Sequence, residues 1–184
     1  MKQNTFWRDA SKAGATIGVV GIITSLLAMI VPSIAFVANL INFVATIYLL
    51  FYFTRKRAAL YANEGFSYSM SIGFMAGSAI FAGIIMGAYS IVANNFLFTE
   101  QVEETLQTLT ATYTSMGTID SNTLDSALEV SRMYLFSPIP LLLSNIFSHL
   151  LSFCFYGLFI AIGTKREADI LSQHRIQRRK INQK

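Results

Sequence analysis

Four long apolar segments dominate the pattern of hydrophobic and polar positions along the chain. They occupy residues 13–31, 34–53, 71–94 and 139–163, and none of them contains Asp, Glu, Lys or Arg. An α-helix of about 20 apolar residues is long enough to cross the hydrocarbon core of a bilayer. The pattern therefore predicts an all-α integral membrane protein, a four-helix bundle that forms a single domain over residues 1–184.

The connections between these segments differ in length. Pro32 and Ser33 leave room only for a tight turn between the first two segments. Gly65 marks a break before the third segment, because Gly is favoured just past a helix end. The loop over residues 97–137 is long, and its apolar residues recur at spacings of three and four. This spacing predicts a loop of two short amphipathic helices.

Glycines recur on one face of the first segment and one face of the third. Small residues at this spacing let two helix backbones approach closely in lipid. We expect the two glycine faces to pack together within the chain, with self-association of two copies as the alternative. The predicted helix-packing residues are Gly14, Gly18, Gly21, Gly73, Gly77, Gly83 and Gly87. The rest of the third helix is expected to face lipid, and it carries Phe74, Phe81, Ile85, Met86, Tyr89 and Phe96.

The distribution of charged residues predicts how the chain is oriented in the membrane. Charged residues make up only 13% of the chain and hydrophobic residues 53%, as in a membrane protein rather than a soluble one. Every Lys and Arg except Arg132 lies before the first segment, just after the second, or in the tail over residues 165–184. Basic residues that flank spans stay in the cytoplasm. The distribution predicts a multi-pass protein of the cytoplasmic (inner) membrane with both termini cytoplasmic and the acidic loop over residues 97–137 extracytoplasmic.

A cleaved signal peptide is the alternative interpretation of the first segment, because a basic head precedes its apolar run. That run exceeds the roughly 7 to 15 residues of a signal-peptide core. Cleavage would leave the topology of the remaining segments unchanged.

Polar side chains share one face of the second segment and one face of the fourth. The predicted intramembrane polar cluster is Asn39, Asn42, Thr46, Asn145, His149, Ser152 and Tyr156. We expect these groups to hydrogen-bond across the helices, with a neutral His149 paired to an asparagine. The alternative is that they line the path of a small carrier or an oligomeric channel. The absence of any Asp or Glu from the four segments favours hydrogen bonding, since proton-coupled carriers usually use an acid.

No residue pattern points to catalysis, to a cofactor or to a metal. Cys154 is the only cysteine, so an intrachain disulfide and a cysteine metal cluster are excluded. His149 among serines lacks the acid that would orient it in a hydrolase. The basic tail is suited to anionic lipid headgroups, and we expect no nucleic acid partner.

These features predict an integral membrane protein that is not an enzyme and that acts through helix packing or a protein partner. The partner would be a second copy of the chain or another membrane protein. The alternative function is a small carrier or oligomeric channel that uses the polar faces of the second and fourth segments.

Several short motifs, in this order, resemble the domain-of-unknown-function 4199 family. They are Phe6-Trp7-Arg8, Lys12-Ala13-Gly14, Asn63-Glu64-Gly65-Phe66-Ser67-Tyr68, Asn94-Asn95-Phe96 and Thr99-Glu100-Gln101, followed by a final span after a proline. Members of this family tend to have a proline where this chain has Thr99. The resemblance implies a small four-span protein of a bacterial inner membrane, and it implies no reaction, ligand or catalytic residue.

Overall fold

The computed structural model describes residues 5–61, 64–116 and 121–166. Over these residues the chain is helical, and the only bridge of strand type is an isolated pair. The α-helices are α1 (Phe6–Ile30), α2 (Ala35–Ala59), α3 (Tyr68–Val92), α4 (Thr99–Met116), α5 (Ser121–Phe136) and α6 (Pro138–Thr164). A short 3-10 turn, η2 (Pro32–Ile34), joins α1 to α2, and a π-helical turn, η3 (Ala93–Leu97), continues α3. The predicted all-helical class is confirmed for the described residues.

Four of these helices are long and apolar enough to cross a membrane: α1, α2 with its preceding turn, α3 with η3, and α6. They coincide with the four predicted segments, and α4 and α5 lie in the loop where two helices were predicted. α1 begins at Phe6 rather than at residue 13. No helix-breaking residue lies between Phe6 and the apolar run, so the helix continues through its charged first turns. Of the basic tail, only Lys165 and Arg166 lie within the described residues.

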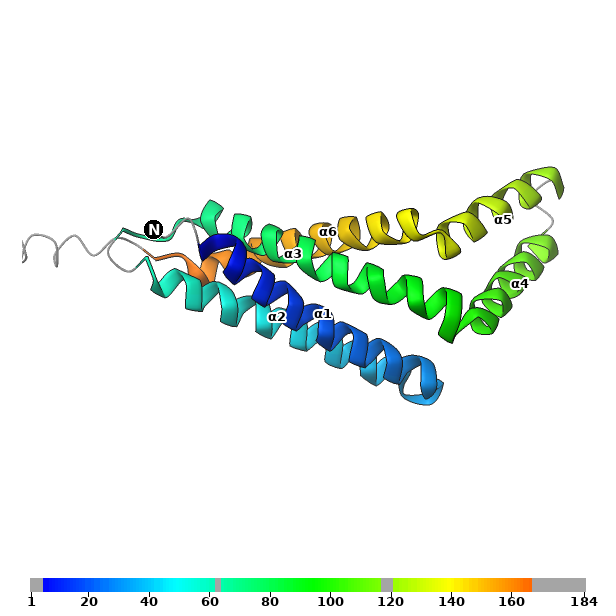
Figure 1. Cartoon of the computed structure of the whole chain (residues 1–184), viewed down its shortest axis with the longest axis horizontal. Coiled ribbons are helices and arrows are strands. Elements are labelled where there is room, and N and C mark those ends of the chain that lie inside the picture. The colour runs from blue at the N-terminus through cyan, green and yellow to red at the C-terminus, as the bar shows by residue number, and fades with distance from the viewer. Residues whose placement is uncertain (1–4, 62–63, 117–120, 167–184) are drawn as a thin grey trace, which may run out of the picture.

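The long helices are arranged around α3 (Figure 1). α3 packs most extensively against α6 and α1, and α2 packs chiefly against α1. The four helices lie together where α1 begins and α6 ends, and we call this the basic end because Arg8, Lys12, Arg57 and Lys165 lie there. Toward the other end, the α1–α2 hairpin diverges from α3 and α6 (Figure 1). We call this the hairpin end, because α1 turns into α2 there. α4 and α5 extend beyond it (Figure 1).

The hydrophobic core draws side chains from all four long helices. Its largest cluster consists of Ile17, Leu50, Met75, Ala79, Ala82, Phe153, Ile160 and Ala161. Ile17 belongs to α1 and Leu50 to α2, whereas the other members come from α3 and α6. α3 and α6 therefore supply most of the core.

Glycines on α1 bring its backbone against α3. A Cβ atom added at Gly14 would meet the backbone carbonyl oxygen of Ser78, and one at Gly18 would lie 3.0 Å from Ile85 Cγ2. At Gly21 the nearest atom would be Met86 Sδ, at 2.9 Å. No side chain larger than hydrogen fits at Gly14 unless the two helices move apart.

The glycines of α3 face two different partners. An added Cβ would lie 2.5 Å from Ile146 Cα at Gly83 and 2.8 Å from Leu142 Cδ1 at Gly87, and both neighbours belong to α6. Gly77 instead faces α1, with the ring of Phe6 at 3.1 Å. Gly73 was predicted to be a helix-packing residue, but no atom of a described residue lies within 4 Å of an added Cβ there. The prediction is wrong for Gly73 because this residue lies on the exposed side of α3, although Ser71 and Phe74 on either side of it in the sequence are buried.

The prediction that the aromatic face of α3 meets lipid is also wrong over most of its length. Phe74 is 1% exposed and packs against Ala10 and Ala13 of α1. Phe81, Ile85 and Met86 lie against the α1 glycines, whereas Phe96 is exposed. The α1 glycines leave room that large side chains fill, so the two glycine faces do not pack directly on each other.

Two contacts join the start of α3 to the end of α6 at the basic end. Gly65 adopts a φ of 84°, which favours glycine, and so the chain turns there as predicted. Phe66 and Arg166 then exchange two backbone hydrogen bonds, of 2.8 and 3.0 Å. The hydroxyls of Ser71 and Thr164 are hydrogen-bonded at 3.1 Å.

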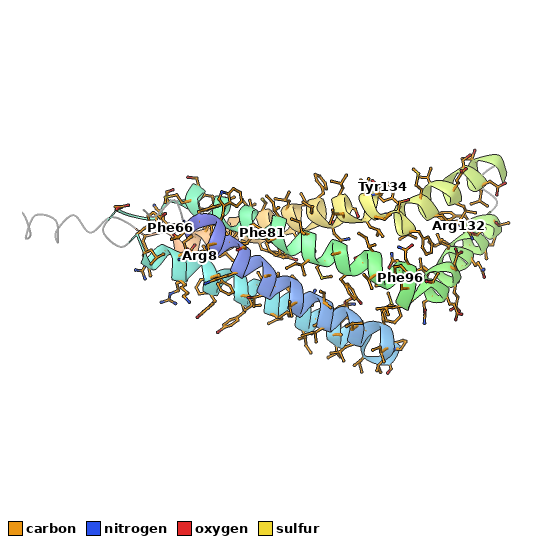
Figure 2. All side chains as sticks on the ribbon, viewed as in Figure 1. Arg8, Phe66, Phe81, Phe96, Arg132 and Tyr134 are labelled. Atoms are coloured by element: carbon orange, nitrogen blue, oxygen red, sulfur yellow. The ribbon has the colours of Figure 1, made fainter. Side chains whose placement is uncertain are left out.

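Polar contacts fix the hairpin end. Asn94 Nδ2 donates to the carbonyl oxygen of Leu135 at 2.8 Å, and Asn95 Nδ2 donates to that of Phe136 at 3.1 Å. These bonds satisfy two carbonyls at the end of α5, which would otherwise lack intrahelical partners. Arg132 joins α5 to α4 through an ion pair with Glu103 at 2.7 Å. Figure 2 shows Arg132 at this end and Arg8 at the basic end.

Candidate functional site

Polar side chains gather around a groove between α2 and α6. The groove has a volume of about 310 Å³. We call it the polar groove; its lining residues are Asn39, Asn42, Phe43, Thr46, Ser148, His149, Ser152, Phe153 and Tyr156. On each helix these residues recur every three or four positions, some as adjacent pairs such as Ser148 and His149, so they fall on one face. Six of the seven residues of the predicted polar cluster therefore line one groove.

Asn145 is the member of the predicted cluster that does not line the groove. Its Nδ2 donates to the hydroxyl of Ser90 on α3 at 3.3 Å and to the backbone carbonyl of Leu141 at 2.9 Å. It is therefore a hydrogen-bonded contact between α6 and α3. Its place at the seam follows from its position beside Gly83 and Gly87, where α6 lies closest to α3.

The predicted hydrogen bonds between the second and fourth segments are absent among the described residues. The side chains of Asn39, Asn42, Thr46, Ser148, Ser152 and Tyr156 make no hydrogen bond to any described residue. Over this stretch the rings of Phe43 on α2 and Tyr156 on α6 contact each other edge-on, with centroids 5.7 Å apart. The shorter polar side chains do not bond across the groove, beyond which the α1–α2 hairpin diverges from α6 (Figure 1). The groove therefore presents unpaired amide and hydroxyl groups.

His149 has a defined orientation at the groove. Its Nδ1 lies 2.8 Å from the backbone carbonyl oxygen of Asn145. A carbonyl oxygen only accepts hydrogen bonds, so Nδ1 carries the proton and Nε2 of the neutral ring is an acceptor. Phe153, which is 2% exposed, packs its ring edge-on to the imidazole with centroids 5.7 Å apart. The polar groove thus combines an imidazole acceptor with amide and hydroxyl groups that donate and accept.

Among residues 5–61, 64–116 and 121–166, no Asp, Glu, Lys or Arg lines the polar groove. A charged ligand would meet no counter-charge in its wall, and burying such a charge without a partner is costly. Neutral molecules that both donate and accept hydrogen bonds match the wall instead. The chemistry of the groove is therefore that of polar binding.

A buried ion pair at the basic end was not predicted from the sequence. Arg57 is only 4% exposed, and its Nη1 lies 2.7 Å from Asp9 Oδ2. Its guanidinium carbon also lies 5.0 Å from the ring centroid of Phe6 and 5.4 Å from that of Phe74. One signal was present: Asp9 is the only acid before the first apolar segment, where it stands between basic residues.

The described part of the chain contains no group of three or more His, Cys, Asp or Glu residues that could hold a metal ion. No family model, no curated protein and no solved structure matches the chain. The resemblance to the domain-of-unknown-function 4199 family thus stays a prediction.

Proposed function

We propose that this chain is a multi-pass protein of a bacterial cytoplasmic membrane that binds small, uncharged polar molecules in the polar groove and carries them across part of the bilayer. Four helices of sufficient length and apolarity support insertion. The position of every Lys and Arg except Arg132 supports an orientation with the basic end in the cytoplasm.

The unpaired polar side chains of the polar groove are the observation that carries this proposal. In a bilayer the hydrocarbon supplies no hydrogen bonds, so a polar group left without a partner costs roughly 1–3 kcal/mol. Six such side chains from two helices face one groove. They lose this cost only if the groove holds water or a polar ligand.

The volume, wall and opening of the polar groove restrict the class of ligand that it could bind. A groove of about 310 Å³ lies near the lower limit of roughly 300 Å³ for small-molecule pockets. Its wall lacks charge and includes the rings of Phe43 and Phe153, which suits a neutral polyol or amide with an apolar face. The divergence of the α1–α2 hairpin from α6 opens the helices toward the hairpin end, on the extracytoplasmic side in the proposed orientation (Figure 1).

A role through helix packing with a partner is supported less well. Six of the seven predicted packing glycines are covered by other helices of the same chain, as described above. They are therefore occupied before a second copy arrives. We also propose no enzymatic activity, since the groove wall contains no acid to act with His149.

Hydration of the polar groove is tested by cysteine accessibility in a Cys154→Ala background. Ser152→Cys places a thiol in the groove, and Leu151→Cys places one on the outer surface of α6, where Leu151 is 66% exposed. Because only the thiolate reacts and hydrocarbon disfavours it, a charged methanethiosulfonate reagent should modify Ser152→Cys about tenfold faster or more in liposomes. Faster reaction at Leu151→Cys would contradict the proposal.

Transport is tested by glycerol entry into proteoliposomes, followed by light scattering. Glycerol permeability should exceed that of protein-free liposomes, and His149→Leu should return it to that level because the imidazole acceptor is lost. Phe147→Leu changes an exposed residue of the same helix outside the groove and should have no effect. Equal glycerol entry in His149→Leu and the unaltered protein would exclude the groove as the path.

The orientation is tested in intact spheroplasts with an impermeant thiol reagent, again without Cys154. Thr112→Cys on α4 should react, and Leu60→Cys at the basic end should not, although both positions are exposed. The reverse labelling pattern would overturn the proposed orientation.

A further inference from the structure

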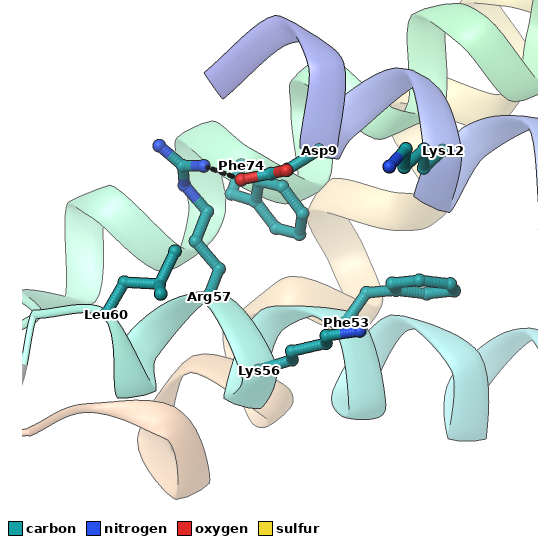
Figure 3. Close-up of a pocket in the computed structure, with 7 residues that line it drawn as sticks. All are labelled: Asp9, Lys12, Phe53, Lys56, Arg57, Leu60 and Phe74. Carbon is teal, nitrogen blue, oxygen red and sulfur yellow. Dashed lines mark hydrogen bonds and ion pairs between the residues drawn. The ribbon is translucent and has the colours of Figure 1, made fainter. Parts of the chain in front are cut away.

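A second cavity lies at the basic end, between α1 and α2, apart from the polar groove. Its volume is about 220 Å³. Figure 3 shows Asp9 and Lys12 on α1 and Phe53, Lys56 and Arg57 on α2 around this space, with Phe74 of α3 behind them. We call it the basic cavity. It shares no lining residue with the polar groove.

The charges around the basic cavity do not cancel. Asp9 is the only acid among the described residues that line it, and this carboxylate is 2.7 Å from Arg57 and 3.9 Å from Arg8. Lys12 and Lys56 form no ion pair with any described residue. The ε-ammonium of Lys56 lies 6.0 Å from the centroid of the Tyr52 ring. Two cations therefore flank the cavity without a counter-charge from the part of the chain that the structure describes.

Arg57 gives the cavity a fixed wall. Its side chain is 4% exposed, and its guanidinium is held by Asp9, by the hydroxyl of Tyr61 at 3.3 Å and by the ring of Phe74. A guanidinium held in this way keeps its position when the cavity is empty, so little conformational entropy is lost when an anion enters. Phe53 and Phe74 add an apolar surface beside the cations.

We propose that the basic cavity binds the phosphate group of an anionic molecule, with Lys12 and Lys56 donating to its oxygens and Arg57 supplying a fixed positive charge. Lysine binds phosphate as a compact charge with three donors, and two lysines on separate helices reach a tetrahedral anion from different directions. A carboxylate offers only two oxygens in one plane and matches this arrangement less well. The site is separate from the polar groove and goes beyond the proposed function.

Two sources supply this chemistry: the headgroup of an anionic phospholipid and free phosphate. Lys12 directly precedes one apolar segment, and Lys56 follows another by one helical turn. In a chain that spans the bilayer, both lysines therefore lie at headgroup depth. The partly exposed ring of Phe53 then suits the glycerol and first methylene groups of a lipid.

The test measures binding to the purified full chain in a nonionic detergent by native mass spectrometry. The chain is titrated with phosphatidylglycerol, with phosphatidylcholine and with inorganic phosphate, each alone. We expect one tight equivalent of phosphatidylglycerol. Lys12→Gln/Lys56→Gln should weaken it about 25-fold, because each lysine near an anionic headgroup contributes roughly a fivefold factor in affinity.

The matched control is Arg55→Gln/Arg166→Gln. It removes the same charge from two exposed positions at the basic end that do not line the cavity. This variant should bind phosphatidylglycerol within about twofold of the unaltered chain, because a charge in high dielectric contributes little at a distance. Circular dichroism should show the same helix content in both double variants, since all four positions are exposed.

Each outcome decides the proposal. Binding of inorganic phosphate with the same dependence on Lys12 and Lys56 supports the site and assigns it to a soluble phosphate. Equal loss of binding in the two double variants, or no loss in Lys12→Gln/Lys56→Gln, overturns it. His149→Leu should bind phosphatidylglycerol as tightly as the unaltered chain. The proposal for the polar groove and the proposal for the basic cavity can therefore fail independently of each other.

Discussion

The two sides of α6 differ in how they meet neighbouring helices. Toward α3, its backbone is so close that an added Cβ at Gly83 would lie 2.5 Å from Ile146 Cα. Toward α2, polar side chains face a groove of about 310 Å³. Both surfaces belong to one apolar helix. Small residues bring these helices together, whereas polar residues without partners mark where they stand apart.

The same contrast explains why α2 is the most loosely packed of the long helices. It has few contacts with α3 and α6 and packs chiefly against α1. Its buried contacts are concentrated toward the basic end, where Leu50 enters the core and Arg57 pairs with Asp9. Toward the hairpin end α2 has mostly exposed apolar side chains, such as Phe36 and Leu40.

The largest effect should come from adding one methyl group at the α3–α6 contact. Gly83→Ala forces backbone atoms of Ile146 and Asn145 to move, and we expect a loss of about 3 kcal/mol in the free energy of unfolding, the upper end for overpacking. Unfolding in mixed micelles, followed by circular dichroism, measures it. A change below about 0.5 kcal/mol would show that α6 moves away from α3 at little cost. The α3–α6 contact would then be no tighter in energetic terms than the contact of α6 with α2.

A smaller loss should follow from breaking the attachment of α2 to α1. Asp9→Asn leaves the buried guanidinium of Arg57 without its carboxylate, and we expect a loss of about 2 kcal/mol in the same unfolding assay. This is below the roughly 3–5 kcal/mol for a fully buried pair, because Asp9 is 26% exposed.

The control for Asp9→Asn is Glu103→Gln, the same chemical change in a more exposed ion pair. Arg132 and Glu103 are 60% and 33% exposed, so that variant should lose less than about 1 kcal/mol. Equal losses in the two variants would mean that burial of Arg57 adds nothing to its pair.

A substitution at Gly73 should stabilise the protein, because no described residue packs against this position of α3. No described residue has an atom within 4 Å of an added Cβ, so Gly73→Ala should raise the free energy of unfolding by roughly 0.5–1 kcal/mol through its better helix propensity. Thermal unfolding beside Gly83→Ala measures the two glycines under one condition. Destabilisation by Gly73→Ala would indicate that another molecule covers this surface.

The smallest change in stability should come from the polar groove. Asn42 makes no hydrogen bond to a described residue, so Asn42→Leu should change the free energy of unfolding by less than about 0.5 kcal/mol. Asn145→Leu is the matched variant and should lose about 1–2 kcal/mol, because Asn145 bonds to Ser90 and Leu141. Equal losses would show that Asn42 has partners and is not free to bind a ligand.

Much of the fold could be predicted because it depends on local patterns. Apolar run length located α1, α2, α3 and α6, and spacings of three and four located α4 and α5. Helical periodicity also placed Asn39, Asn42 and His149 on faces that line one groove. These features need no knowledge of which helices are neighbours.

The features that were missed depend on which helices are neighbours. Small-residue spacing shows that a face of α3 is packed, but it does not show that Gly83 meets α6 while Gly77 meets α1. Small-residue spacing on α3 also does not predict the burial of Phe74, because the small residues that make room for its ring lie on α1. The pairing of Asp9 with Arg57 likewise joins two helices.

The contact of Gly83 with α6 has a consequence for the order in which the protein is made. Synthesis proceeds from the N-terminus at roughly 5–20 residues per second, so α3 is complete on the order of seconds before α6 leaves the ribosome. The side of α3 that faces α1 is covered early, whereas the side with Gly83 and Gly87 waits for Ile146 and Leu142. During that interval the nascent chain exposes a helix surface shaped for another backbone, and the length of α4 and α5 sets how long it stays open.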